Sequence, residues 1–351
     1  MAEFLLELYS EEIPPALQIN ARNELKKNFE KGINEEGLKF KNLKIYSSPT
    51  RLTLLIQDIS EKVKILSKEI KGPKVGVPDN ILESFIKSQK ISKDDLFEKE
   101  INKGRFYFIK TKPKEVLTKD LLIKLIPKSL NEISWRKSMK WSDNSLIWGR
   151  PLRSIMALFN KKILKFKYHH LESTDTTIIE SDLVFKTKKI QTFKEYKSFL
   201  ISNKIILDHI ERKEKILRRF ESICRSKNYK GNFDLKLVEE VTNLVENPNV
   251  LFINFDKDYL KIPNEIITST LQGHQKYFPL FDNKEKLTNY FLVVANKPDV
   301  KNFIKEGNKR VVEARLSDAK FFWNKDKSKN LIKQIGKLKT IMFYDKIGTI
   351  Y

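Results

Sequence analysis

The first thirty residues join a strand-like segment to a helix across a rigid break. Phe4 to Tyr9 is a short apolar run with strand character. Pro14-Pro15 interrupts it, and Pro15 suits the first turn of a helix, where a missing amide hydrogen costs nothing. Further strand-like runs lie at 45–46 and 51–59, so residues 1–60 are predicted to form a small α+β unit. Apolar residues recurring every four positions predict the buried helical face, formed by Leu17, Ala21, Leu25 and Phe29.

The remaining chain alternates between the same two kinds of pattern. Between residues 61 and 160 the sequence predicts a loop at 71–78, short helices at 79–100 and a strand at 105–110. A mostly helical stretch follows at 115–141. An apolar run then covers 146–159 and is interrupted at Gly149-Arg150-Pro151. Beyond residue 200 the sequence predicts helices at 235–245 and 264–271, a strand at 250–255, a hairpin of 277–281 with 289–295, and a helix whose apolar face carries Val312, Leu316, Ala319 and Trp323.

The helix that begins at Asp208 carries the clearest signals. Asp208 and Glu211 form a capping-box pattern, and the exposed face holds the pairs Glu211–Lys215 and Glu214–Arg218. Cys224, the chain's single cysteine, is predicted to be core, and it excludes an intrachain disulfide framework, so a reduced, cytoplasmic protein is the simplest interpretation. The predicted buried stripe is Ile210, Leu217, Phe220 and Cys224.

A length of 351 residues favours two or three domains. The patterns predict a multidomain α+β fold, with mixed or antiparallel sheets and flanking helices. We expect the small unit at 1–60 to belong to the N-terminal domain, a basic α+β continuation at 61–190, and a helical segment followed by an α+β region at 191–351. The lysine-rich, weakly periodic stretch at 186–200 marks the boundary.

The chain is strongly basic, with 68 Lys+Arg against 45 Asp+Glu and a formal net charge of +23. Only 12 of the basic residues are arginine, and the excess of lysine, isoleucine and asparagine is typical of an AT-rich coding bias. The charge is nevertheless uneven: residues 1–60 have a net charge of −1, whereas 128–170 and 301–351 each have +8. This distribution favours local basic surfaces and an anionic partner such as nucleic acid.

Common motifs of catalysis, nucleotide binding and export are missing from the sequence. It has no G-x-x-x-x-G-K-[ST], G-x-G-x-x-G or G-x-S-x-G motif, no secretory signal, and no apolar run near the roughly 18–20 residues that span a bilayer. Adjacent His169 and His170 are predicted to point to opposite faces of a strand. The four histidines and one cysteine lack metal-ligand spacing. We therefore predict no catalytic residue, no metal site and no membrane association.

Several segments could still contact a partner. Glu11-Glu12 precedes a predicted helix, where acidic residues complement the helix dipole. Arg51, at a strand start after Ser48-Pro49-Thr50, could anchor either a phosphate or a carboxylate. Between Trp135 and Arg153, three tryptophans alternate with five basic residues, which suits either nucleic-acid stacking or a core surrounded by solvated lysines. Arg150 and Arg153 are the better phosphate ligands there, because a guanidinium fork matches phosphate oxygens.

Two later segments combine polar groups with aromatic rings. His274, within Gln272 to Pro279, could act as a general base, but with no acid or nucleophile pattern beside it a structural histidine is favoured. In 307–323, Asn308 is predicted to cap a helix from which basic residues project beside a strong apolar stripe.

Taken in order along residues 3–350, these segments resemble the β subunit of the bacterial heterotetrameric glycyl-tRNA synthetase. The resemblance is specific because the motifs are collinear, although each one alone is weak. They are Glu11-Glu12-Ile13-Pro14-Pro15, Ser48-Pro49-Thr50-Arg51-Leu52, Lys71-Gly72-Pro73, Met139-Lys140-Trp141 with Arg150-Pro151, Glu246-Asn247-Pro248, Gln275-Lys276-Tyr277-Phe278-Pro279 and Arg315-Leu316-Ser317-Asp318-Ala319-Lys320-Phe321-Phe322.

Two departures from the family pattern stand out. Where the family often has Gly-His-Arg-Phe, this chain has Ile179-Glu180-Ser181-Asp182-Leu183, so no role is carried over from that motif. Family members are also about twice this long, continuing into a helical domain and an anticodon-binding domain. We therefore expect this chain to be the front portion of a longer subunit, with those two domains absent.

The resemblance implies a division of labour in glycine–tRNA ligation. The α subunit would bind glycine, ATP and Mg²⁺ and carry the catalytic core, whereas this chain would bind no cofactor and would position tRNA(Gly) within an α2β2 complex. Phosphate contacts would fix the register of the tRNA. The candidate tRNA-binding residues are Arg51, Lys71, Lys74, Arg150, Arg153, Lys276, Arg310 and Arg315. The charge alone leaves two alternatives open: a stand-alone basic RNA-binding protein, and a scaffold whose lysines reflect coding bias.

Overall fold

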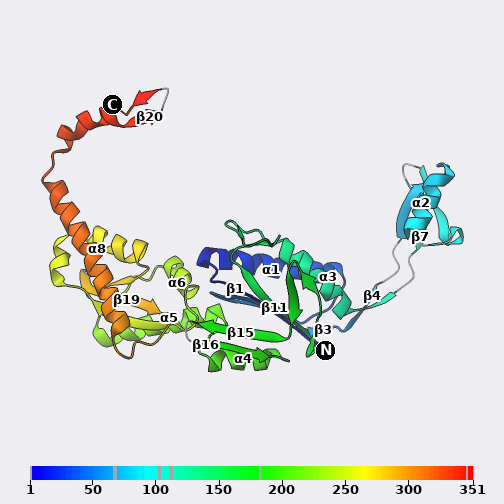
Figure 1. Ribbon diagram of the computed structural model, residues 1–351, viewed down its shortest axis with the longest axis horizontal. Helices are drawn as coiled ribbons and strands as arrows, with labels where there is room; N and C mark the ends of the chain where they lie inside the picture. The colour runs from blue at the N-terminus through cyan, green and yellow to red at the C-terminus, as the bar shows by residue number, and fades with distance from the viewer. Residues whose placement is uncertain are drawn as a thin grey trace. The chain divides into compact units, whose positions relative to one another are not determined.

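The computed structural model describes residues 2–65, 69–89, 91–101, 104–110, 114–181, 184–344 and 347–350. The chain forms two compact units, each built from several segments (Figure 1). Unit 1 contains Met1–Glu11, Ile19–Ile45 and Arg51–Tyr196. Unit 2 contains Lys197–Tyr351 together with two short N-terminal segments, Glu12–Gln18 and Tyr46–Thr50.

The main sheet of unit 1 is mixed, and its central strand is β1 (Ala2–Ser10). β1 pairs antiparallel with β3 (Arg51–Ile59) and β11 (Leu152–Phe159). Seven consecutive residues of β1 are buried, so this strand is covered on both faces. The sheet order is β13-β14-β11-β1-β3-β2, with β12 beside β11. The outer strands are β2 (Asn42–Ser48), β12 (Lys162–Ile163), β13 (Lys167–Tyr168) and β14 (Leu171–Thr174). The sheet is mixed because β14 runs parallel to β11.

Helices α1 (Pro15–Glu35) and α3 (Thr118–Asn131) lie side by side over this sheet (Figure 1). The Asn28 side chain donates to the Ser129 carbonyl, and the rings of Phe4 and Phe29 stack at 5.9 Å, which packs α1 onto β1. The predicted apolar face of α1 is confirmed, because all four of its residues are buried: Leu17, Ala21, Leu25 and Phe29.

In unit 1, β4 (Lys62–Ile65) pairs antiparallel with β8 (Lys114–Leu117), and the chain between these two strands in the sequence forms a small separate sheet, β5-β7-β6. The predicted loop at 71–78 is wrong in its first half, because β5 (Glu69–Lys74) pairs with β7 (Gly104–Lys110). The register shifts between Lys71 and Lys74, so Gly72-Pro73 forms an irregularity within the strand rather than ending it. A Cβ atom on Gly72 would lie 2.8 Å from Phe85 Cε1, which explains why glycine suits this position.

Two predicted helical stretches are also partly strand. The 79–100 region contains α2 (Asp79–Gln89) and the short η1 (Lys93–Asp95), but then β6 (Leu96–Ile101), which pairs with β7. The 115–141 region ends its helix at Asn131, and Met139–Lys140 forms β9, paired with β10 (Ile147–Trp148). These segments form strands because each pairs with another strand, and a local sequence pattern does not predict such pairing.

Two further elements complete unit 1: the hairpin β15 (Thr176–Ser181) with β16 (Val184–Lys189), and the start of α4 (Phe193–Ser202). The segment that differs from the family's Gly-His-Arg-Phe motif includes Asp182 and Leu183, and these two residues lie outside the described residues. His169 has φ of 52° and lies with His170 in the turn between β13 and β14, so the prediction that these two histidines share a strand is wrong.

Unit 2 is built on a three-stranded antiparallel sheet, β17-β19-β18 (Figure 1). Its strands are β17 (Asn249–Asn254), β18 (Phe278–Phe281) and β19 (Leu287–Ala295). Val250 and Phe252 pack with α5 (His209–Lys227) and α6 (Leu235–Thr242). Leu251 and Ile253 pack with α7 (Asn264–Ser269) and α8 (Phe303–Lys327) on the other face. The alternation along β17 thus produces a three-layer arrangement.

The structure corrects two details of the unit 2 helices. On α5, Ile210 is 57% exposed, and the buried residues are Arg212, Ile216, Phe220, Ile223 and Cys224. The core-facing side of α5 therefore includes a buried arginine, Arg212, and a pattern of apolar residues does not predict a buried arginine. On α8, the helix begins at Phe303, so Asn308 lies inside it and is not a cap; Asn308 instead donates to the Ile304 carbonyl and accepts from the Tyr277 hydroxyl.

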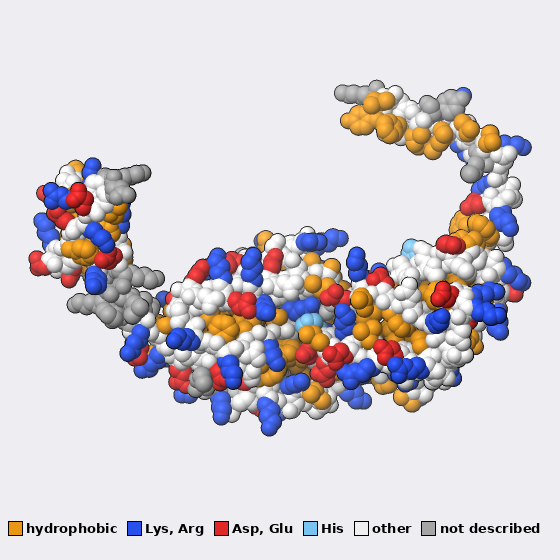
Figure 2. Space-filling model, turned by 180° about the vertical axis from the view of Figure 1, so that it is seen from behind, with side chains coloured by type: hydrophobic (Ala, Val, Ile, Leu, Met, Phe, Trp, Pro, Cys, Tyr) orange, Lys and Arg blue, Asp and Glu red, His pale blue; other side chains and the backbone are white. Residues whose placement is uncertain are grey.

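Beyond α8 the described chain continues through η4 (Leu331–Thr340), β20 (Met342–Tyr344) and β21 (Gly348–Thr349). Hydrophobic side chains are exposed along this segment, as Figure 2 shows. The remaining short elements are the 3-10 helix η2 (Lys257–Lys261) and the short π-helix η3 (Thr270–His274). Among the described residues, no helix is both long and apolar enough to cross a bilayer.

Cys224 offers a simple check on the packing of α5. The side chain lies in the apolar cluster under the sheet, and burial raises the pKa of its thiol. Because the thiolate is the reactive form, we expect reaction with a thiol reagent at pH 8 to be at least about tenfold slower in the folded chain than in urea. Equal rates in the two states would show that α5 does not pack as described.

Gly149 tests the packing of the tryptophan-rich segment. Trp148 is buried and its ring lies 4.8 Å from that of Trp135, and a Cβ on Gly149 would lie 2.3 Å from Trp135 Cε3. We expect Gly149→Ala to lower the free energy of unfolding by about 1–3 kcal/mol in urea titrations, as overpacking does. The matched control is Gly307→Ala inside α8, where nothing lies within 4 Å; it should be neutral or stabilising. Equal effects would contradict this packing.

Candidate nucleic-acid interface

Basic side chains do not gather in one broad patch on the face of the protein that Figure 2 draws. Figure 2 shows lysine and arginine interleaved with aspartate and glutamate over the visible surface. Net charge therefore does not locate a binding site, and the shape of the surface must be considered as well. A groove in unit 2 combines positive charge with a defined shape.

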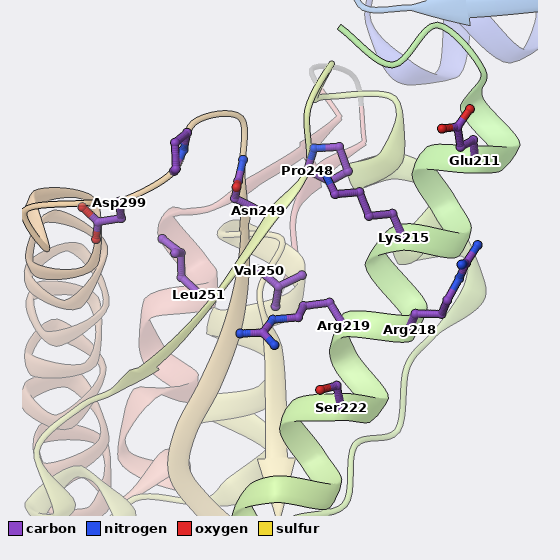
Figure 3. Close-up of a pocket in the computed structure, with 11 residues that line it drawn as sticks. Glu211, Lys215, Arg218, Arg219, Ser222, Pro248, Asn249, Val250, Leu251 and Asp299 are labelled. Atoms are coloured by element: carbon purple, nitrogen blue, oxygen red, sulfur yellow. The ribbon is translucent and has the colours of Figure 1, made fainter. Parts of the chain in front are cut away.

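This groove has a volume of about 640 Å³ and lies between α5 and the start of β17 (Figure 3). Lys215, Arg218 and Arg219 line it from the helix, and Asn249 and Val250 line it from the strand. Lys215 and Arg219 extend toward the strand side, whereas Arg218 points away from it (Figure 3). We call this surface, together with its continuation described next, the α5–β17 groove.

A neighbouring hollow of about 290 Å³ continues the groove toward the C-terminal end of α5. It shares Arg219 and Val250 with the first and adds Lys227, Phe252 and Lys305. The helix rises 1.5 Å per residue, so the stretch from Lys215 to Lys227 is about 18 Å long. The groove is therefore long enough for an extended ligand.

The sequence of α5 places these cations on one face. Residues 215, 219, 222 and 226 follow one another at intervals of three or four and line the groove together with residue 218, while Ile216, Phe220 and Ile223 face the core. The Asp208 carboxylate accepts from the Ile210 amide and caps the helix, which confirms the Asp208 half of the predicted capping box, whereas Glu211 pairs with Lys197. The helix thus presents a fixed basic row at the surface.

The charges in the groove are only partly neutralised. Lys215 Nζ donates to Asn247 Oδ1 at 2.9 Å, and Arg218 pairs with Glu214 at 2.7 Å, as predicted. Asp299 accepts from the Ile304 and Lys305 amides at the start of α8, so its charge is directed to that helix end. Within the described ranges, Arg219 has no carboxylate partner. The described lining residues carry more positive charges (Lys215, Arg218, Arg219, Lys227 and Lys305) than negative ones (Glu211 and Asp299).

Aromatic rings border the far end of the groove. The rings of Phe252 and Tyr290 stack with centroids 4.8 Å apart and an interplanar angle of 10°, and Tyr229 lies 5.3 Å from Tyr290. All three side chains are partly exposed, and Lys227 Nζ lies 5.9 Å from the Phe252 ring centroid. Burial, followed by the neighbouring Tyr290, raises the pKa of Tyr229. We call Tyr229, Phe252 and Tyr290 the aromatic ladder.

The structure decides between the two alternatives for Arg51. Its guanidinium is buried, and Nε lies 3.0 Å from Glu7 Oε1, so the anchored group is a carboxylate. Arg51 also donates to the Ile178 carbonyl. With a side chain 2% exposed, Arg51 has no surface to offer a phosphate in this structure.

The other candidate residues lie at exposed or half-exposed positions in separate places. Lys71 and Lys74 are exposed on β5, with Lys71 Nζ 3.5 Å from the Phe106 ring centroid. Arg150 is half-buried and donates to the Gly149 carbonyl. Arg153 pairs with Glu11 and Glu180. Their contact with tRNA stays a prediction.

Three candidates lie in unit 2, outside the α5–β17 groove. Lys276 pairs with Glu240 at 3.1 Å beside a second hollow, and Arg310 and Arg315 are exposed on α8. The structure therefore does not bring the predicted residues together into one site. The sequence reasoning missed Arg219, Lys227 and Phe252, and the Arg218-Arg219 doublet on a helix in an arginine-poor chain was the available signal.

Two of the resemblance motifs meet within unit 2. Glu246 Oε1 accepts from the Ser48 and Thr50 hydroxyls at 2.9 and 3.0 Å, joining the Ser48–Leu52 segment to Glu246-Asn247-Pro248. Pro248 lines the groove, and Asn247 accepts from Lys215. The motifs thus support the strand end that forms one wall of the groove.

The fold and the groove define a class: a multidomain α+β protein with a cationic, aromatic-bordered groove suited to phosphate-bearing ligands. Among the described residues, no three histidine, cysteine, aspartate or glutamate side chains are grouped as a metal site. A family model described as the glycyl-tRNA synthetase beta subunit matches residues 4–351. The chain belongs to this family.

Named relatives agree with the family match. The glycine–tRNA ligase beta subunit of Rickettsia prowazekii (strain Madrid E) is 36% identical over 351 residues, covering 100% of this chain and 53% of the relative. The glycine–tRNA ligase beta subunit of Rickettsia bellii (strain OSU 85-389) is 36% identical, covering 100% of this chain and 53% of the relative. That of Clostridioides difficile (strain 630) is 34% identical, covering 99% of this chain and 52% of the relative. The chain spans about half the length of the curated relatives it matches.

Proposed function

We propose that the chain acts within the β subunit of glycine–tRNA ligase, where it binds and positions tRNA(Gly). The family match over residues 4–351 carries this proposal. The basic α5–β17 groove supports it, because lysine and arginine contacts to phosphates supply most of the sequence-independent affinity for RNA. We also assign the protein to the cytoplasm, where this activity takes place.

The chemistry would lie on a second chain. In the proposed reaction, the glycine carboxylate attacks the α-phosphorus of ATP and displaces pyrophosphate, and a 3′-terminal hydroxyl of the tRNA then attacks the glycyl carbonyl and displaces AMP. Glycine, ATP and Mg²⁺ would lie on the α subunit. This chain would contribute positioning, and holding reactants in place is worth about 7–11 kcal/mol of barrier in the best cases. The proposed assembly is α2β2.

Co-purification with the α subunit tests this proposal. We expect the tagged chain to retain a co-expressed glycyl-tRNA synthetase α subunit on an affinity column, and the eluted complex to have the mass of a heterotetramer by light scattering. A stand-alone RNA-binding protein would instead bind tRNA and leave the α subunit in the flow-through. If neither this chain nor a full-length relative retains the α subunit, the proposed role is wrong.

A further inference from the structure

We propose that the α5–β17 groove binds an unpaired RNA strand, with its phosphates along Lys215 and Arg219 and one base on the aromatic ladder. This inference rests on the proposed function and names the form of RNA that one of its surfaces recognises. It is independent of the residues predicted from the sequence, which lie elsewhere.

Arg219 and Lys215 offer the groove's phosphate contacts. The Arg219 guanidinium extends into the groove (Figure 3) and has no carboxylate partner among the described residues. Among the residues that the structure describes, Lys215 contacts a neutral amide oxygen, Asn247 Oδ1, and no carboxylate. A phosphate between them would gain charge-assisted hydrogen bonds without first breaking an ion pair. Arg218 differs, because it is paired with Glu214 and points away.

Phe252 offers the groove's surface for a base. This ring lines the groove, stacks on Tyr290, and has the Lys227 ammonium over it, 5.9 Å from the ring centroid. A base stacking on the ladder would displace that ammonium, which could then move to the adjacent phosphate. Base–aromatic stacking needs an exposed π-face, which bases in a duplex do not offer. The ladder therefore favours a single strand over a helix.

An extended peptide is the competing occupant. β17 is the edge strand of its sheet in the described part of the chain, and a peptide could add to it as a further strand. The groove favours RNA, because the Arg219 guanidinium and the aromatic ladder both suit a nucleotide, and backbone pairing would use neither. The experiment therefore includes this occupant as an outcome.

Fluorescence anisotropy with the whole chain tests the inference. The probes are a labelled, unstructured 12-nucleotide RNA and a hairpin duplex with the same number of phosphates, each measured between 50 and 200 mM salt. We expect the single strand to bind at least about tenfold more tightly than the duplex. The double variant Lys215→Ala/Arg219→Ala should weaken single-strand binding about tenfold and reduce the salt slope by about 1.4, since each phosphate contact in a single strand contributes about 0.7.

Phe252→Leu separates stacking from charge. We expect it to weaken single-strand binding about five- to tenfold with an unchanged salt slope, and to abolish the quenching of a 2-aminopurine placed in the RNA. The control is Arg225→Ala on the same helix, because Arg225 is exposed, pairs with Glu221 and does not line the groove. Urea titrations of each variant establish that it is folded.

Three outcomes would overturn the inference. The first is equal affinity for duplex and single strand, and the second is unchanged RNA binding by folded groove variants. The third is loss of α-subunit retention by groove variants whose RNA binding is intact, which would indicate that the groove binds a peptide. Measurement with tRNA(Gly) separates the two proposals. If the wild type binds tRNA(Gly) and the groove variants bind it equally well, only this inference fails; if the wild type does not bind it, the proposed function fails too.

Discussion

Arg212→Ala is expected to lower the free energy of unfolding by about 3–5 kcal/mol, one of the two largest effects in the molecule. The Arg212 side chain is fully buried in unit 2. It donates from Nε to the Thr242 carbonyl, from Nη1 to the Ile206 and Leu207 carbonyls, and from Nη2 to the Ser47 carbonyl. Removing it would leave several buried acceptors without a donor and create a cavity. Urea unfolding followed by circular dichroism measures the loss.

Two further variants make this prediction specific. Arg212→Lys should also be strongly destabilising, because an ammonium cannot reach carbonyls on both sides as a planar fork does. Arg218→Ala on the same helix is the control, because its side chain is 74% exposed, and it should change the stability by no more than about 0.5 kcal/mol. A loss below about 1 kcal/mol for Arg212→Ala would contradict the buried network.

Glu7→Gln is expected to destabilise unit 1 by about 3–5 kcal/mol. Both side chains of the Glu7–Arg51 ion pair are 2% exposed, and Glu7 Oε1 also accepts from the hydroxyls of Thr177 and Tyr196. Neutralising the carboxylate would leave the buried charge of Arg51 uncompensated. Burial, with Glu7 second, raises the pKa of Tyr196 well above its ordinary value, so its hydroxyl stays a donor.

A double-mutant cycle checks the origin of this effect. Glu7→Gln/Arg51→Met removes both charges, so we expect it to be clearly less destabilising than the sum of the two single variants. Thr53→Val, which affects only the contact from Thr53 to the Tyr196 hydroxyl, serves as the milder comparison. Additive single effects would show that the ion pair is not coupled.

Local patterns predicted those elements whose partner is near in sequence or whose apolar face is continuous. The α1 face and the β18–β19 hairpin are examples, because a period of four residues and a polar turn are visible in a short window. β5 and β6 were missed because both depend on pairing with β7. Arg212 was missed because its burial depends on carbonyls from three separate segments, none of which a helical pattern can show.

The candidate site was predicted less well than the fold. Motif position singled out Arg51, but three-dimensional packing places Glu7 beside it. The groove cations lie on a helix whose basic face looked like ordinary solvated pairs, and for Arg218 that interpretation is confirmed. What distinguishes Arg219 is the neighbouring strand end and the rings of Phe252 and Tyr290, which are 30 or more residues away in the sequence.

The most direct test of the central claim is tRNA(Gly) binding by the chain together with the α subunit. Filter binding at 50 and 200 mM salt compares the α subunit alone with the same amount of α subunit plus this chain. We predict that adding the chain tightens binding of tRNA(Gly) at least about tenfold at 50 mM salt, with an advantage that falls steeply as salt rises. Identical affinity with and without the chain would contradict the account.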